Sequence, residues 1–305
     1  MNRSRSAAIF SAAITPLLAS AIFVALGCGG SESTPPPEPD DRIIAFTAVS
    51  TVTQGSSISL MHADGSNIIA LTDGAWDDSP SWTADGLHIV FDSYPLAGPG
   101  GGIWIMDADG SNKRPLVVGF DGQLSPDGTK LLYTAAMPNS PTAVYVANAD
   151  GSSPRRLTNN PDGEEHAAWS PDGKYVAYSA FRNSKVNIYI VNADGTGEAQ
   201  VSHTTGLADW PAWSPDGRKI AFEQGDANFS LALHVINADG SGEQRLTGDN
   251  CGHPSWSPDG LTIAYQCVDA AGESLPRIYR IDTDGSHRSV LTTRGSFSTA
   301  PAWKP

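Results

Sequence analysis

The segment Pro211-Ala212-Trp213-Ser214-Pro215-Asp216-Gly217-Arg218-Lys219-Ile220-Ala221-Phe222 carries the pattern that predicts the fold. A short apolar strand ends at Trp213, and Ser-Pro-Asp-Gly then predicts a tight turn, because proline presets φ and glycine accepts a positive φ. The residues after the turn are rich in β-formers and predict a second strand. Further along, Leu231–Ile236 predicts a third strand and Arg245–Thr247 a short outer one.

This unit recurs along the chain. One series of Asp-Gly pairs falls at 85–86, 127–128, 172–173, 216–217 and 259–260, at intervals of 42, 45, 44 and 43 residues. A regular period in this range is typical of propellers and solenoids. The repeat has no helical periodicity, which excludes a helical solenoid, and four short antiparallel strands per repeat make a propeller blade.

The number and phase of the repeats predict how the ring closes. The second strand occurs six times, at Ile43–Phe46, Leu87–Phe91, Lys130–Tyr133, Lys174–Tyr178, Arg218–Phe222 and Leu261–Tyr265. The chain opens on a second strand and ends on a first strand, Ala300–Trp303. We therefore predict an all-β, six-bladed β-propeller over residues 41–305, in which the C-terminal strand joins the first blade and removes exposed sheet edges.

Three copies of Trp-Ser-Pro-Asp-Gly, at 169–173, 213–217 and 256–260, are each followed by an (Ile/Val)-Ala-(Phe/Tyr) strand. This pattern resembles the TolB-like, WD40-like propeller repeat, and the resemblance covers residues 41–305. It implies the fold, whereas the function has to be argued from a site. A tryptophan that recurs in nearly every repeat is expected to pack between blades and not to bind a ligand.

The N-terminus predicts export. An apolar, uncharged run, Ala7–Gly27, follows two arginines, as in a secretory signal, although its length would also allow a membrane helix. The ending Val24-Ala25-Leu26-Gly27-Cys28 resembles a bacterial lipoprotein signal, in which the cysteine is lipidated. We predict a lipoprotein signal peptide over 1–27 and a lipidated Cys28 with a Pro-rich tether over 28–40; a plain secretory signal with an incidental cysteine is the alternative.

Acyl chains on Cys28 would hold the protein on a membrane, since each buried methylene contributes about 0.8 kcal/mol. By resemblance to lipoprotein sorting, Gly29 in place of aspartate favours the outer membrane. We therefore expect an exported, lipid-anchored protein on the periplasmic face of the outer membrane or at the cell surface. We also expect it to be a monomer.

Composition narrows the classes of partner. The net charge of −14 argues against nucleic acid, because phosphate backbones are bound by lysine and arginine patches. Three cysteines are too few for a disulfide scaffold. Cys251 and Cys267 flank one predicted hairpin and would face or nearly face each other, so we predict a structural disulfide in an oxidising compartment. A register shifted by one residue would instead put the two thiols on opposite faces.

The residues that precede each first strand should ring one mouth of the central channel. They form a mostly acidic collar with two histidines and one tryptophan. Its predicted binding residues are Asp77, Asp78, Asp121, Glu164, Glu165, His166, Asp209, Trp210 and His253.

The predicted collar is consistent with three alternative functions. The first is docking of an envelope protein or basic peptide, weakened by salt. The second is a metal-dependent lyase or hydrolase, because histidine and carboxylate side chains bind divalent ions such as Zn²⁺ and Mn²⁺. The third is an inert spacer. The sequence contains neither a Gly-x-Ser-x-Gly nor a His-Glu-x-x-His motif, so we predict a binding protein with no cofactor, and keep a divalent metal as the alternative.

Overall fold

The computed structural model describes residues 40–50, 55–73, 76–94, 101–136, 140–225, 230–248, 250–268, 275–293 and 296–305. The predicted signal peptide, Cys28 and the tether up to residue 39 lie outside them and stay predictions. In the described residues every regular element is a β-strand, which confirms the all-β class. No helix in this part of the chain has the length and apolar character to cross a membrane.

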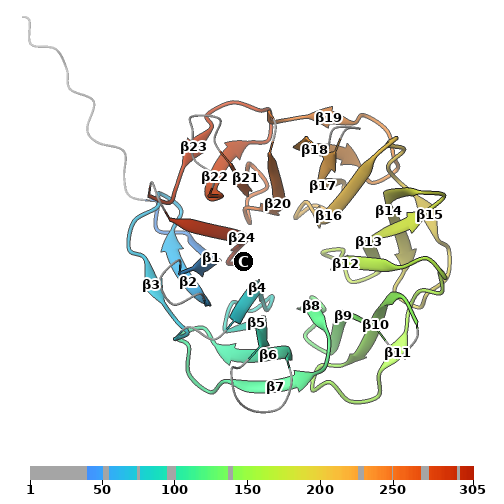
Figure 1. Cartoon of the computed structure of the whole chain (residues 1–305), viewed down its shortest axis with the longest axis horizontal. Helices are drawn as coiled ribbons and strands as arrows, with labels where there is room; N and C mark the ends of the chain where they lie inside the picture. Colours follow the sequence, from blue (N-terminus) through green and yellow to red (C-terminus); the bar gives the residue numbers. More distant parts are fainter. Residues whose placement is uncertain are drawn as a thin grey trace, which may run out of the picture. The chain divides into compact units, whose positions relative to one another are not determined.

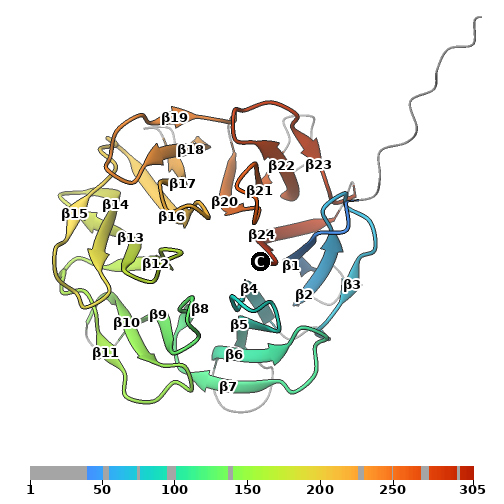
Figure 2. The same ribbon diagram turned by 180° about the vertical axis from the view of Figure 1, so that it is seen from behind.

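The strands lie around a central opening, in units that run from the centre to the rim (Figures 1 and 2). Each unit begins on an innermost strand that ends, in all but one case, on a repeat tryptophan. The innermost strands are β4 (Trp76–Trp82), β8 (Phe120–Leu124), β12 (Glu164–Trp169), β16 (Leu207–Trp213), β20 (Cys251–Trp256) and β24 (Phe297–Trp303).

A tight turn joins each innermost strand except β24 to a second strand. The second strands are β1 (Ile43–Val49), β5 (His88–Tyr94), β9 (Lys130–Ala136), β13 (Tyr175–Arg182), β17 (Lys219–Gly225) and β21 (Thr262–Cys267). Each is longer at its C-terminal end than the sequence predicted, because polar residues continue the strand beyond its aromatic residue. That extension matters for the site described below.

The third and outer strands complete each unit and are joined by Asp-Gly turns. The third strands are β2 (Ser56–His62), β6 (Gly102–Asp107), β10 (Thr142–Asn148), β14 (Lys185–Asn192), β18 (Leu231–Asn237) and β22 (Arg277–Asp282). The outer strands are β3 (Ile69–Ala70), β7 (Arg114–Val117), β11 (Arg155–Arg156), β15 (Ala199–Gln200), β19 (Gln244–Arg245) and β23 (Ser289–Val290).

Pairing within each unit is antiparallel, as β8-β9-β10-β11 and β20-β21-β22-β23 illustrate. The last strand, β24, pairs with the first, β1, through Ile44 opposite Trp303 and Val49 opposite Phe297. Strands from the two ends of the described chain therefore share one sheet.

The core lies between neighbouring units, where sheet faces pack on each other. One cluster joins Leu132 and Val144 of the β8–β11 unit to Trp169 and Tyr178 of the next. The indole of Trp82 donates to the carbonyl oxygen of Ala302 in the neighbouring unit at 3.2 Å, and Trp213 and Trp256 make the equivalent bond to Ala168 and Ala212. The repeat tryptophans are therefore packing residues, as their recurrence predicted.

A disulfide joins Cys251 of β20 to Cys267 of β21, with the two sulfur atoms at 2.04 Å. The two cysteines are opposite each other in the strand register. Both are buried, so the bond lies inside the sheet and has a structural role.

Candidate functional site

All six innermost strands contain a β-bulge at the same place. The register with the second strand shifts there, and one residue has φ between 47° and 55°. A bulge adds an unpaired residue and re-aims its side chain. These bulge residues are Ser79, Asp121, His166, Trp210, His253 and Ala300.

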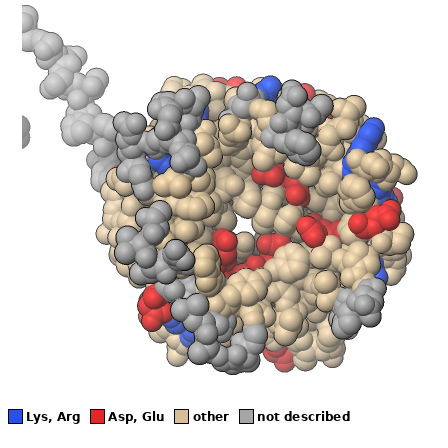
Figure 3. Space-filling view, in the orientation of Figure 1, with Lys and Arg blue, Asp and Glu red and all other residues tan. Residues whose placement is uncertain are grey.

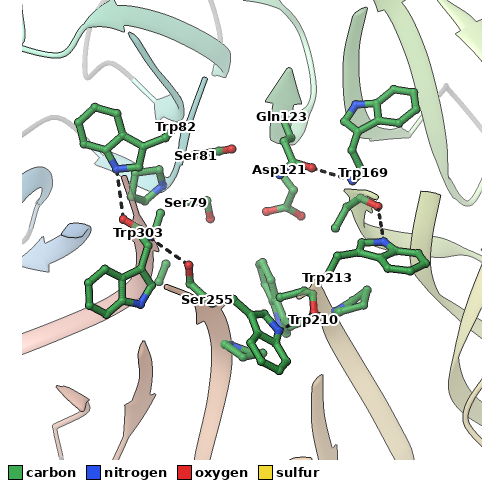
Figure 4. Close-up of a pocket in the computed structure, with 18 of the residues that line it drawn as sticks. Ser79, Ser81, Trp82, Asp121, Gln123, Trp169, Trp210, Trp213, Ser255 and Trp303 are labelled. Atoms are coloured by element: carbon green, nitrogen blue, oxygen red, sulfur yellow. Dashed lines mark hydrogen bonds between the residues drawn. The ribbon is translucent and has the colours of Figure 1, made fainter. Parts of the chain in front are cut away.

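Five of the six bulge residues, all except His166, line one end of a central cavity of about 440 Å³ (Figure 4). The wall next to them consists of small and apolar residues, such as Pro80, Ala167 and Pro211. The other end reaches the turns, where Pro126 and Pro171 line it. The cavity therefore runs from the bulge residues to the Trp-Ser-Pro-Asp-Gly turns, along the second half of each innermost strand.

Three of the bulge residues form an aromatic stack. The imidazole of His166 lies 3.7 Å from the Trp210 ring centre, and the His253 ring lies 3.9 Å from Trp210. They come from β12, β16 and β20, which follow one another around the opening (Figure 1). The other three innermost strands supply smaller side chains at this level, Ser79, Asp121 and Ala300, so the wall of the channel is aromatic on one side only.

His166 is held between two carboxylates. Its Nδ1 lies 2.7 Å from Oδ1 of Asp209, and its Nε2 lies 3.6 Å from Oδ2 of Asp121. Burial by itself would lower the pKa of His166. The hydrogen bond to Asp209 and the charges of Asp209, Asp121 and Glu165 outweigh burial and raise the pKa to about 9. His166 is therefore a positively charged imidazolium at neutral pH.

In Asp121, burial outweighs the effect of the neighbouring opposite charge on the pKa. Burial, with smaller contributions from the charges of Asp209, Glu165 and Asp78, raises its pKa to about 6 against the lowering effect of the His166 charge. Its backbone N–H donates to both carboxylate oxygens of Asp92, at 3.1 and 3.0 Å. The pKa of Asp92 is well above its usual range, first because of burial and then because of the Asp121 charge.

Sequence reasoning missed a second polar ring, which includes Asp92. It consists of the residue that follows the aromatic residue in each second strand, where the predicted strand had ended. Its members are Thr47, Asp92, Thr134, Ser179, Glu223 and Gln266. A polar residue at this place in all six repeats is the signal that could have revealed the ring.

Members of this second ring hold the innermost strand of the next unit. Oε2 of Glu223 accepts a hydrogen bond from the backbone N–H of His253 at 3.3 Å, and Gln266 accepts one from Ala300 at 3.4 Å. Thr47 donates its hydroxyl to Asp78 at 2.7 Å. The ring therefore orients the bulges and adds carboxylates beneath them.

Two further groups have shifted pKa values. Burial, together with the charge of Asp209, raises the pKa of Glu223 to about 7. Burial and the neighbouring His166 cation lower the pKa of His253 to about 3, so its imidazole is neutral. Its Nδ1 finds no hydrogen-bond partner among the described residues.

The structure brings most of the predicted collar together, with one correction. Asp78, Glu165 and Asp209 lie beside the bulge residues. Glu164 instead lies inside its blade, where Oε1 accepts a hydrogen bond from the Asn160 N–H at 3.3 Å and lies 3.7 Å from Arg182. Successive residues of a strand point to opposite faces, so Glu164 and Glu165 cannot both line the channel. Asp77, at the position equivalent to Glu164, is also buried.

Acidic side chains surround the central opening on the face seen in Figure 3. Six carboxylates interact electrostatically with one another or with His166, namely Asp78, Asp92, Asp121, Glu165, Asp209 and Glu223. Among the described residues no lysine or arginine forms an ion pair with any of them, and His166 is their cationic partner. The site therefore carries more negative than positive charge.

The side chains at the channel also bear on metal binding. In the described parts of the chain, no three His, Cys, Asp or Glu side chains are grouped so that they could hold a metal ion. His166 directs both ring nitrogens at carboxylates, and His253 is stacked on Trp210. The geometry fits a cationic ligand better than a metal ion.

Known structures share this fold. The chain resembles the crystal structure of TolB from Acinetobacter baumannii, with a TM-score of 0.79 at 22% identity, over 88% of this chain and 68% of that one. It also resembles hydrazine synthase from Kuenenia stuttgartiensis (TM-score 0.71, 15% identity, 88% of this chain and 47% of that one). A third similar structure is an oligogalacturonate lyase in complex with manganese (TM-score 0.52, 17% identity, 84% and 74%).

Identities this low show a common fold and no more, and the three names already differ in function. No curated protein matches the sequence. Residues 128–305, more than half of the chain, match the family of the TolB beta propeller domain. Together with the four-stranded antiparallel units and their Trp-Ser-Pro-Asp-Gly turns, this match shows that the chain belongs to the TolB beta propeller domain family.

Proposed function

We propose that this protein is a lipid-anchored envelope protein whose propeller binds a basic segment of another protein at the acidic mouth of its channel. The observation that carries the proposal is the excess of buried carboxylates over His166. We also infer that the strands form six blades and that β24 closes the ring by completing the blade that begins with β1. The pairing of these two strands supports closure.

The excess charge favours a cationic partner for a physical reason. Burial is the first cause that raises the pKa values of Asp121, Asp92 and Glu223, and repulsion from neighbouring carboxylates adds to it. A lysine or arginine brought by a partner would relieve the repulsion, whereas an acidic partner would increase it. The binding energy should then fall with salt, mostly through the exposed part of the interface.

The proposed cellular location rests on the sequence. The apolar run before Cys28 supports export and lipidation, and the buried disulfide suits an oxidising compartment outside the cytoplasm. We propose the periplasmic face of the outer membrane or the cell surface as the location, and a monomer as the state. Mass spectrometry of Cys28 tests the anchor, because an unmodified, uncleaved N-terminus would exclude it.

Capture of partners tests the docking proposal. The full chain would be immobilised beside a variant carrying Asp78→Asn, Glu165→Gln and Asp209→Asn, and envelope extract would be passed over both. We expect a basic protein, retained in stoichiometric amount by the unchanged chain and released by about 0.5 M salt. Equal retention of a protein on both columns would move docking away from these carboxylates and contradict the proposal, and no retention on either would support an inert spacer.

The metal-dependent lyase or hydrolase is the second candidate. Its support is the likeness in fold to the manganese-bound lyase and the presence of His166 and His253 at the channel. The side-chain geometry of the described residues gives it less support than docking. Elemental analysis of the purified chain separates the two: stoichiometric metal that is lost on His166→Ala would favour the enzyme.

A further inference from the structure

The central cavity changes in chemical character along its length. At the end near the turns its wall is apolar, with Pro126, Pro171 and the edges of the repeat tryptophans. At the bulge end it presents the Asp121 carboxylate and the neutral His253 imidazole. A ligand that fits both ends has an apolar stem and a positively charged tip.

Two buried atoms at the bulge end lack a hydrogen bond. Oδ2 of Asp121 and Nδ1 of His253 have no such partner among the described residues. The Asp121 side chain is only 11% exposed, and its nearest cation, Nε2 of His166, is 3.6 Å away, too far for a hydrogen bond. Both atoms are closed to solvent, so a ligand in the cavity meets the part of the Asp121 carboxylate that stays exposed, where a nitrogen cation gains a charge-assisted bond.

We propose that this cavity binds a single lysine-like or arginine-like group, an alkyl stem with a nitrogen cation at its tip, entering from the Trp-Ser-Pro-Asp-Gly turns. The stem lies along the proline and alanine wall, since such side chains bury their methylenes on apolar surface. The tip donates to Asp121. The site is a second one, reached from the opposite end of the channel to the acidic mouth proposed for docking.

The space suits such a group. A cavity of about 440 Å³ is at the small end of ligand sites, which run from roughly 300 to 1,000 Å³. The aromatic stack occupies one side of the channel at the level of the bulges, and the small Ser79 and Ala300 leave the other side open. The open side of the channel beside Asp121 therefore leaves room for an alkyl stem.

Calorimetric titration of the full chain with n-butylammonium chloride tests the inference, and n-butanol is the uncharged control. We expect saturable binding of one butylammonium per chain and none of butanol. Asp121→Asn should weaken butylammonium at least about tenfold, because a neutral amide replaces the carboxylate. Asp73→Asn, at an aspartate with a 97% exposed side chain, should leave binding unchanged.

A second variant keeps the test valid if Asp121→Asn fails to fold. Ser79→Lys adds a tethered ammonium at a cavity-lining position, so it should abolish butylammonium binding and raise the melting temperature. Unchanged affinity in this variant overturns the proposal. Equal binding of butanol, or tighter binding of Mn²⁺ in place of butylammonium, also overturns it.

These results are independent of the docking proposal. Butylammonium binding without any captured protein would keep the cavity site and remove the docking function. A captured protein together with no butylammonium binding would keep docking and remove the cavity site.

Discussion

The two halves of each innermost strand differ in how closely their sequences repeat from unit to unit, and their comparison separates packing residues from the residues of the proposed site. The second half, from the residue after the bulge to the tryptophan, has a similar short sequence in five of the six strands, and β8 departs from it with Gly122-Gln123-Leu124. In three of them the indole donates to the neighbouring unit. The first half and the bulge differ from blade to blade, with serine, aspartate, histidine, tryptophan and alanine at one position. The repeated half packs neighbouring units together, and the variable half carries the side chains of the proposed site.

The largest effect should come from the repeated half. Trp169 is 7% exposed in a core cluster, so Trp169→Ala should reduce the free energy of unfolding by about 3 to 5 kcal/mol. Denaturant unfolding gives the value. Trp76, at the start of β4 and 46% exposed, is the control, and Trp76→Ala should cost less than about 1 kcal/mol. Similar losses in both variants would contradict the division into halves.

The disulfide should matter less and only for stability. It closes a loop between residues 16 apart, so replacing both Cys251 and Cys267 with serine should cost about 3 kcal/mol. Binding of a lysine-rich peptide at about 20 °C, where the variant stays folded, should not change. A large loss of peptide affinity in a folded variant would show that the bond also shapes the channel.

The charge on His166 should make stability depend on pH. Its pKa is raised from 6.5 to about 9, so its contribution is complete below about pH 6.5 and is lost as the pH rises through 9. The free energy of unfolding should therefore fall by about 2 kcal/mol between roughly pH 7 and pH 9. Thermal or denaturant unfolding across this range measures the slope. His166→Gln should flatten it, and an equal slope in that variant would assign the titration to another group.

The smallest effect should be on the affinity for a cationic peptide, which should fall as the pH falls. Asp121 and Glu223 take up protons near pH 6 and pH 7, because burial raises both pKa values. The channel loses negative charge as the pH falls from about 8 to 5, so affinity for a lysine-rich peptide should drop several-fold, by about 1 kcal/mol. Fluorescence titration at each pH would show this. Affinity that rises on acidification would contradict an acidic site.

The fold was predictable because the second-strand pattern occurs six times in the sequence. Turn chemistry at Ser214-Pro215-Asp216-Gly217 and the strand that follows it recur with a regular period, so each repeat supports the others. The site was only partly predictable. The position before each first strand predicted four of the bulge residues, Asp121, His166, Trp210 and His253, but gave no indication of the His166–Trp210–His253 stack.

Other parts of the site depend on contacts that one repeat cannot reveal. Asp92 and Glu223 lie beyond the apolar pattern of their strands, and their role comes from hydrogen bonds to the next blade. The sequence predicts Glu164 as a channel residue because it precedes a first strand. The alternation of side chains along β12 places it inside the blade instead, beside Arg182.

The central claim is that the variable half of the innermost strands forms a site for cations. Calorimetric titration of the full chain with a lysine-rich peptide, beside the double variant Asp78→Asn with Glu165→Gln and the exposed control Asp73→Asn, tests it most directly. We predict that the unchanged chain and the control bind equally and lose affinity with salt, while the double variant binds at least about tenfold more weakly. Equal affinity in all three proteins would contradict the claim.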